Sequence, residues 1–193
     1  MNKTYLNLHR YLGPLLKIFF PLHIRGLENI PEGGAMVCAN HSSMLDPLLI
    51  ALAFGSNEHL RFMAKKELFT VPVVGKVITG AEAFPVDRGN NDLSAIRTAL
   101  RFLKGGCKVM LFPEGTRVSA DDAVAAKNGA ISLASRTGVP LVPVYLGREK
   151  RLFRKTELVI GEPYLLGRIP REEYEMRAGE LMDKIYGLGT ETV

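Results

Sequence analysis

Beyond residue 25, short apolar runs of strand length alternate with longer segments of helical periodicity, and this alternation constrains the fold more than any other feature. It predicts an α/β fold built from βαβ units, in which mostly parallel strands form a sheet and helices cover its faces. In such sheets, sites form outside the carboxyl ends of the strands. The expected strands are Ala35–Ala39, Leu60–Ala64, Ala83–Val86, Lys108–Phe112, Leu141–Leu146 and Glu157–Ile160. The expected helices are Leu48–Phe54, Glu67–Ile78, Asp92–Leu103, Ala123–Thr137 and Arg171–Tyr186.

Length and composition fit a single globular domain with a core of its own. The chain has 193 residues, of which 47% are hydrophobic and 23% are charged, and no repeat, linker or low-complexity tract divides it. Cys38 and Cys107 lie in apolar, strand-like surroundings, which favours small core residues over a disulfide or a metal site. We therefore expect one α/β domain over residues 25–193, preceded by a helical appendage over residues 1–24.

The appendage has the pattern of an amphipathic helix that Pro14 kinks and Pro21 ends. It is too short and too interrupted to span a bilayer, which takes roughly 20 apolar residues. Two interpretations remain: the helix lies in the membrane interface, or it packs on the core as an ordinary helix. The apolar face consists of Tyr5, Leu8, Leu12, Leu15, Leu16, Phe19 and Leu22, and the polar face of Lys3, Asn7, Arg10 and Lys17.

The charge of the chain points to an anionic partner. The net charge is +5 and the pI is near 9.3, which suits nucleic acid, anionic lipid or a phosphorylated substrate. The basic residues form no long run, and Trp is absent. We therefore expect anionic lipids and phosphorylated substrates as partners, and we do not expect nucleic acid.

The strongest chemical signal is the stretch Asn40-His41-Ser42-Ser43-Met44-Leu45-Asp46-Pro47. Asp46 falls where a helix N-cap is expected, and Pro47 falls at the first helical position. The four residues between His41 and Asp46 then form a tight turn, which can fold the His41 ring back onto the Asp46 carboxylate. A carboxylate that holds an imidazole in one tautomer makes it a useful general base. The ordinary alternative is a capping aspartate with a histidine nearby by chance.

Three other stretches place polar side chains after expected strands or in an expected helix. In Phe112–Arg117, Gly115 permits a close backbone approach, and Arg117 offers a planar fork that matches a phosphate. Arg88, after the strand at 83–86, is either a second phosphate ligand or the ion-pair partner of Asp87. Lys127 is either an anion ligand or a solvated surface lysine.

In their order and spacing, these stretches resemble the glycerolipid acyltransferase family, specifically the 1-acyl-sn-glycerol-3-phosphate (lysophosphatidate) acyltransferases. The resemblance covers roughly residues 25–165. It rests on N-H-x4-D at Asn40–Asp46, a strand ending in arginine at Phe84–Arg88, F-P-E-G-T-R at Phe112–Arg117 and a V-P-x-V-P-V-like strand at Val139–Val144.

The resemblance implies transfer of a fatty acyl group from acyl-coenzyme A or acyl-carrier protein to the sn-2 hydroxyl of a lysophospholipid, giving phosphatidic acid in phospholipid biosynthesis. His41 would be the general base, and Asp46 would orient it. Arg117 and Arg88 would bind the acceptor phosphate, in a pocket shaped by Glu114, Gly115 and Thr116. No cofactor or metal besides the acyl donor is implied. The expected place is peripheral, at the cytoplasmic face of the cell membrane and in contact with anionic lipids.

Other functions stay open on the sequence. In one alternative, the same reaction uses glycerol-3-phosphate or another lysophospholipid as the acceptor. In a second, the chain is a membrane lipid-binding protein without catalysis. A serine hydrolase lacks support, because no G-x-S-x-G elbow is present. The apolar stretch Leu68–Ile78 either lines a groove for the acyl chain or packs in the core.

Overall fold

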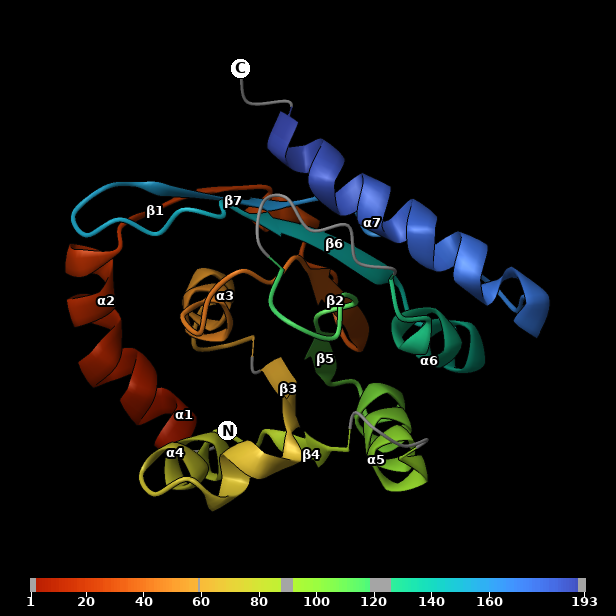
Figure 1. The fold of residues 1–193 in the computed structure, drawn as a ribbon, viewed down its shortest axis with the longest axis horizontal. Coiled ribbons are helices and arrows are strands. Elements are labelled where there is room, and N and C mark those ends of the chain that lie inside the picture. Colours follow the sequence, from red (N-terminus) through yellow and green to blue (C-terminus); the bar gives the residue numbers. More distant parts are fainter. Residues whose placement is uncertain (1–2, 59, 88–91, 119–125, 191–193) are drawn as a thin grey trace.

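A seven-stranded sheet forms the centre of the computed structural model, which describes residues 3–58, 60–87, 92–118 and 126–190 (Figure 1). The strand order is β1-β7-β6-β2-β5-β3-β4. The strands are β1 Leu22–Arg25, β2 Ala35–Ala39, β3 Leu60–Lys65, β4 Phe84–Val86, β5 Lys108–Leu111, β6 Leu141–Leu146 and β7 Thr156–Ile160. The pairs from β6 to β4 are all parallel, whereas β7 runs antiparallel to β6 and β1 runs parallel to β7. The prediction of a mostly parallel sheet is confirmed.

The parallel block brings three loops to one edge. Because β2 lies between β6 and β5, the loops that follow these strands leave the sheet side by side at their carboxyl ends. Every residue of β2 and of β5 is buried, as expected for strands covered on both faces. The rigid centre of the sheet therefore fixes the starting points of the loops that carry the sequence motifs.

Helices cover both faces of the sheet (Figure 1). On one face α3 (Asp46–Phe54) packs against the strands through one buried apolar cluster. On the other face α5 (Leu93–Lys104), α6 (Gly129–Thr137) and α7 (Tyr174–Thr190) pack through a second cluster. The N-terminal helix lies outside α3, where Gly13 faces Leu52. Close to its first turn lies the short helix α4 (Val74–Gly80).

The N-terminal helix is continuous but changes its winding. It consists of α1 (Lys3–Asn7), a π-helical turn (Leu8–Leu12) and α2 (Gly13–Phe19). Pro14, in the first turn of α2, has no N–H to donate, and the wider turn before it lets the Gly13 N–H reach the carbonyl of Leu8. No helix among the described residues is long and apolar enough to cross a membrane.

Three expected elements need correction. The helix expected at Ala123–Thr137 begins at Gly129, and residues 126–128, which the structure describes, are not helical. The N-terminal helix ends at Phe19, before Pro21, but Leu22, which the sequence pattern places on its apolar face, begins β1 instead. This strand pairs with β7 and has no counterpart among the expected strands. The boundary expected at residue 24 thus falls inside a strand of the sheet. The helix expected at Glu67–Ile78 is split into a 3₁₀ turn (Lys66–Thr70) and α4. Pro72 explains the break, because the residue before a proline avoids helical geometry and Val71 is extended.

Candidate active site

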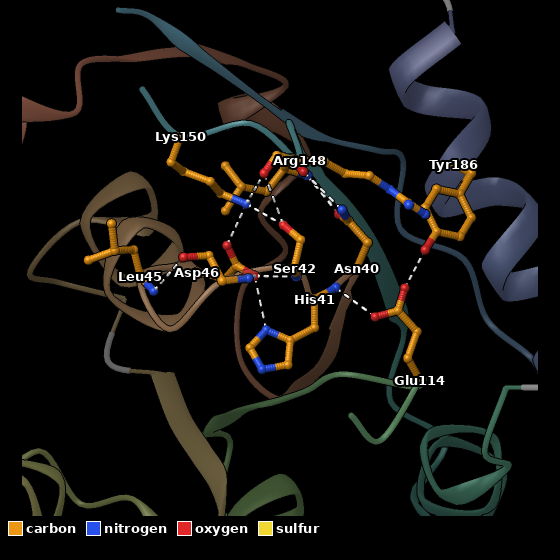
Figure 2. A network of polar contacts seen from close by, with 11 residues as sticks. Asn40, His41, Ser42, Leu45, Asp46, Glu114, Arg148, Lys150 and Tyr186 are labelled. Atoms are coloured by element: carbon orange, nitrogen blue, oxygen red, sulfur yellow. Dashed lines mark hydrogen bonds and ion pairs between the residues drawn. The ribbon is translucent and has the colours of Figure 1, made fainter. Parts of the chain in front are cut away.

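Asn40 joins the end of β2 to the end of β6. Its side-chain Nδ2 donates to the Leu146 carbonyl at 2.9 Å, and the Leu146 N–H donates to its Oδ1 at 2.8 Å. The amide therefore completes the hydrogen-bond ladder as a backbone peptide would, beyond the last residue of β2. This pairing holds the following residue, His41, at the carboxyl edge of the sheet (Figure 2).

His41 and Asp46 are in direct contact, as the sequence predicts. His41 Nδ1 lies 2.9 Å from Asp46 Oδ2, and the aspartate is fully buried. Because a carboxylate only accepts, Nδ1 carries the hydrogen of the neutral ring, and Nε2 keeps its lone pair. Figure 2 shows the second ring nitrogen pointing away from Asp46. The ring is thus prepared to take a proton at Nε2.

The aspartate does not occupy the N-cap position that the sequence suggested. Asp46 is the first residue of α3, after Leu45. Its Oδ2 also accepts from the backbone N–H groups of Ser42 and Ser43, each at 2.7 Å. The carboxylate therefore caps the turn that precedes it instead of the helix that follows, and this fixes the path of the chain between His41 and Asp46.

Lys150, in the loop after β6, holds the other oxygen of the aspartate. Its Nζ lies 2.6 Å from Asp46 Oδ1 and donates to Ser42 Oγ at 2.7 Å, and its side chain is 4% exposed. Burial lowers the pKa of Lys150, and the ion pair with Asp46 opposes that effect. Burial raises the pKa of Asp46, but the contacts with His41 and Lys150 outweigh it, so this pKa lies below its usual value.

Lys150 has no local signal in the sequence. It stands in a run of charged residues, Arg148-Glu149-Lys150-Arg151, that has the composition of an ordinary surface loop. Only the parallel pairing of β2 with β6 brings this loop to the His41 turn.

Glu114 of the F-P-E-G-T-R stretch holds the backbone of His41. Its buried carboxylate accepts from the His41 N–H at 2.7 Å and from the Tyr186 hydroxyl of α7. Burial raises the pKa of Glu114, although both hydrogen bonds oppose it. Burial and Glu114 together raise the pKa of Tyr186 to about 12, so its hydroxyl keeps the proton that it donates. The Arg148 guanidinium lies 5.1 Å from the centre of the Tyr186 ring.

Four other predicted phosphate-binding residues, Gly115, Thr116, Arg117 and Lys127, lie in or beside the same loop. The Val118 N–H donates to the His41 carbonyl at 2.9 Å, which holds the segment that contains Thr116 and Arg117 against the His41 turn. Gly115 has φ +69°, a left-handed conformation that favours glycine, and the Lys127 side chain passes close to it, 2.6 Å from where a Cβ would lie. The side chains of Thr116, Arg117 and Lys127 are exposed. Arg88 lies outside the described residues.

An apolar cavity opens beside the histidine. The His41 ring stacks on Phe112, with centroids 3.9 Å apart, and both residues belong to the wall of a cavity of about 370 Å³. Its other walls come from the N-terminal helix, α3, β3 and the segment around α4. They include Tyr5, Leu8, Leu12, Leu16, Leu48, Ala51, Leu52, Phe62, Leu68, Val73, Val74, Val77 and Ile78. A base at the wall of an apolar cavity suits a substrate with a hydrocarbon chain.

Comparison with known proteins agrees with this geometry. A family model described as Acyltransferase matches residues 21–147. The chain belongs to the acyltransferase family. It is 36% identical over 166 residues to the 1-acyl-sn-glycerol-3-phosphate acyltransferase of Bacillus subtilis, covering 81% of this chain and 82% of that protein. It is 32% identical to the Streptococcus pneumoniae protein of the same name, over 89% of this chain and 61% of that one.

A solved structure shares the fold of this acyltransferase. The 1-acyl-sn-glycerophosphate acyltransferase of Thermotoga maritima superposes with a TM-score of 0.74 at 28% sequence identity. The match covers 98% of this chain and 80% of that one. Among the described residues, no cluster of three or more His, Cys, Asp or Glu side chains is arranged to hold a metal ion.

The position of Lys150 gives a testable prediction. Lys150→Met leaves Asp46 Oδ1 without its counter-ion and loosens the His41 turn, so kcat for acyl transfer should fall on the order of 100-fold while KM changes little. The measurement is steady-state kinetics of both substrates, together with a check by circular dichroism that the variant is folded. Lys104→Met, at the exposed end of α5, is the matched control. Unchanged kcat in a folded Lys150→Met protein would refute a positioning role.

Proposed function

We propose that this acyltransferase moves a fatty acyl group from a thioester to the sn-2 hydroxyl of 1-acyl-sn-glycerol-3-phosphate, giving phosphatidic acid for phospholipid biosynthesis. The observation that carries the proposal is a histidine fixed by a buried carboxylate at the wall of an apolar cavity, beside a loop that bears exposed cationic side chains. The names of the Bacillus and Streptococcus relatives support this choice of acceptor.

The chemistry follows from the His41–Asp46 pair. Nε2 of His41 takes the proton of the acceptor hydroxyl as its oxygen attacks the thioester carbonyl carbon. The imidazolium that forms is stabilised by Asp46, which remains ionised because its pKa lies below the usual value. The tetrahedral intermediate collapses, the carbon–sulfur bond breaks, and the leaving thiolate takes the proton back from Nε2. The products are an ester and a free thiol, and His41 returns to its starting state.

The acceptor phosphate is assigned to the cationic side of the F-P-E-G-T-R loop. Arg117 and Lys127 supply the positive charge, Thr116 supplies a hydroxyl, and the Lys127 side chain passes close to Gly115. Glu114 contributes by holding the His41 backbone, since a carboxylate would repel the phosphate. Arg88 remains in this set on the sequence pattern alone.

The apolar cavity is assigned to a fatty acyl chain. Its volume of about 370 Å³ lies in the roughly 300–1,000 Å³ range of small-molecule sites, and its lining comes mainly from aliphatic and aromatic residues. The stretch Leu68–Ile78 contributes several of these, which favours the groove over simple core packing. Acyl-coenzyme A and acyl-carrier protein are both anionic donors, and the net charge of +5 suits either. No further cofactor takes part in the proposed reaction.

The N-terminal helix is proposed to lie in the membrane interface. Tyr11, Leu15 and Ile18 expose 71%, 50% and 63% of their surface, although the opposite side of the same helix lines the cavity. A helix that is apolar on both sides needs a second apolar environment, and the headgroup region of an anionic membrane provides one. The proposed place is the cytoplasmic face of the cell membrane, with the protein attached peripherally.

Replacement of the base tests the mechanism. His41→Ala should lower acyl transfer by about 10²–10⁴-fold, because the acceptor hydroxyl loses its proton acceptor. The measurement is release of free thiol from an acyl thioester that depends on lysophosphatidate. His23→Ala, in the exposed part of β1, is the matched control and should keep the wild-type rate. Equal rates in the two variants would remove the mechanism, and vesicle binding by the wild type without turnover on any acyl donor would favour a lipid-binding protein.

The phosphate assignment predicts a selective defect. Arg117→Gln should raise KM for lysophosphatidate by about 10–100-fold, because one charge-assisted contact is lost. Its KM for 1-acylglycerol, which has no phosphate, should stay the same. Arg136→Gln, an exposed arginine of α6, is the control. A panel that adds glycerol-3-phosphate identifies the preferred acceptor, and an equal loss on both acyl acceptors would contradict the assignment.

Filling the cavity tests the acyl assignment. Ala51→Phe projects a ring from α3 into the space, so the ratio of rates for short over long acyl chains should rise by at least about tenfold. The measurement is a competition between acyl donors of different length in one reaction. Arg136→Phe, on the opposite face of the sheet, should leave the ratio unchanged. A uniform loss over all chain lengths in Ala51→Phe would mean that the chain binds elsewhere.

A further inference from the structure

The loop between β6 and β7 exposes two large apolar side chains to solvent. Leu152 is 58% exposed and Phe153 is 64% exposed. Phe153 also has φ +61°, a left-handed conformation that is rare for a bulky residue and costs of the order of 1–3 kcal/mol. The chain therefore holds a large aromatic ring in water through a strained backbone, which is expensive for an ordinary surface turn.

Contacts with the N-terminal helix explain how the strain persists. The Phe153 N–H donates to the Phe19 carbonyl at 2.7 Å, and the Thr156 N–H donates to the Pro21 carbonyl at 2.8 Å. The rings of Phe19 and Phe153 lie 5.2 Å apart. Figure 1 shows the loop curving past the end of α2. These contacts therefore hold the loop against the end of the helix.

These two joined segments carry two sets of exposed apolar side chains. One is the outer stripe of the helix, Tyr11, Leu15 and Ile18, which repeat at steps of four and three residues. The other is the pair Leu152 and Phe153. We call these five residues, with the loop 151–155 that carries the pair, the docking surface.

Cations accompany the apolar residues, although one of them, Arg151, forms an ion pair with the exposed Glu149 at 2.8 Å. No Asp or Glu occurs before Glu28 in the sequence. Arg10 and Lys17 flank the outer stripe, and Arg151, Arg154 and Lys155 flank the apolar pair, all of them exposed. Apolar side chains interleaved with Lys and Arg fit the interface of an anionic bilayer, where the chains enter the headgroup region and the cations meet lipid phosphates. A protein partner would have to supply a matching acidic and apolar face.

We propose that loop 151–155 is a second membrane contact, which binds an anionic bilayer together with the outer stripe of the N-terminal helix. Lys150, which pairs with Asp46, directly precedes the loop, so docking brings the His41 site next to the lipid surface. The inference rests on the proposed function only in taking the substrate to be a membrane lipid.

Vesicle sedimentation of the full chain tests the proposal. The probe is phosphatidylcholine vesicles with and without phosphatidylglycerol. The double variant Leu152→Ser, Phe153→Asn should bind the anionic vesicles at least about tenfold more weakly, because two apolar side chains no longer enter the lipid. Asn tolerates the left-handed conformation, so the thermal midpoint should not fall. Leu165→Ser, 71% exposed beside Tyr164 in the cluster that packs with α7, is the matched control and should bind like the wild type.

Two more readouts separate the possible outcomes. Arg154→Gln with Lys155→Gln should weaken binding to anionic vesicles and leave binding to pure phosphatidylcholine unchanged. Acyl transfer is measured in parallel in detergent micelles, where the loss in the Leu152/Phe153 variant should be about tenfold smaller than its loss on vesicles. Equal losses in the two systems, or vesicle binding equal to the Leu165→Ser control, would overturn the docking role. Wild-type vesicle binding without any acyl transfer would instead refute the proposed function and leave the docking surface standing.

Discussion

The arrangement of the site depends on the buried carboxylate of Asp46 and its contacts. An ionised carboxylate removed from water is costly unless it is paired and hydrogen-bonded. Here Asp46 Oδ2 accepts hydrogen bonds from the His41 ring and from two backbone N–H groups, and Oδ1 forms an ion pair with Lys150. These contacts draw the turn after β2, the start of α3 and the loop after β6 around a single negative charge. The orientation of the imidazole therefore follows from the hydrogen bonds and the ion pair that the buried carboxylate requires.

Two other motif residues, Asn40 and Glu114, support the backbone around His41. Asn40 replaces a peptide in the ladder between β2 and β6, and Glu114 accepts the His41 N–H. Both side chains are buried and both fix the main chain on either side of the His41 side chain. A histidine at the end of a strand would otherwise follow the movements of its loop. His41 is held from its ring and from its backbone, which is the preorganisation that the proposed proton transfer needs.

The sequence predicts what depends on local patterns. The bounds of β2 and β6 are as expected, and the His41–Asp46 contact was found because a five-residue separation in a turn leaves few other geometries. It did not predict β1, because Leu22 also continues the helical spacing of the preceding segment. Lys150 and Tyr186 cannot be predicted from local sequence, because strand order and helix packing bring them to the turn, and their own neighbours in sequence have nothing distinctive. The assigned roles of Arg117 and Lys127 stay predictions, although the structure places both residues near the turn.

The N-terminal helix has two apolar sides, which bears on the route that a proposed lipid substrate takes to His41. One side forms part of the cavity wall, and the other is turned outward with the Leu152–Phe153 loop at its end. In the proposed membrane-bound position, a single helix separates the bilayer from the cavity, so a hydrocarbon tail has a short way to travel without crossing water.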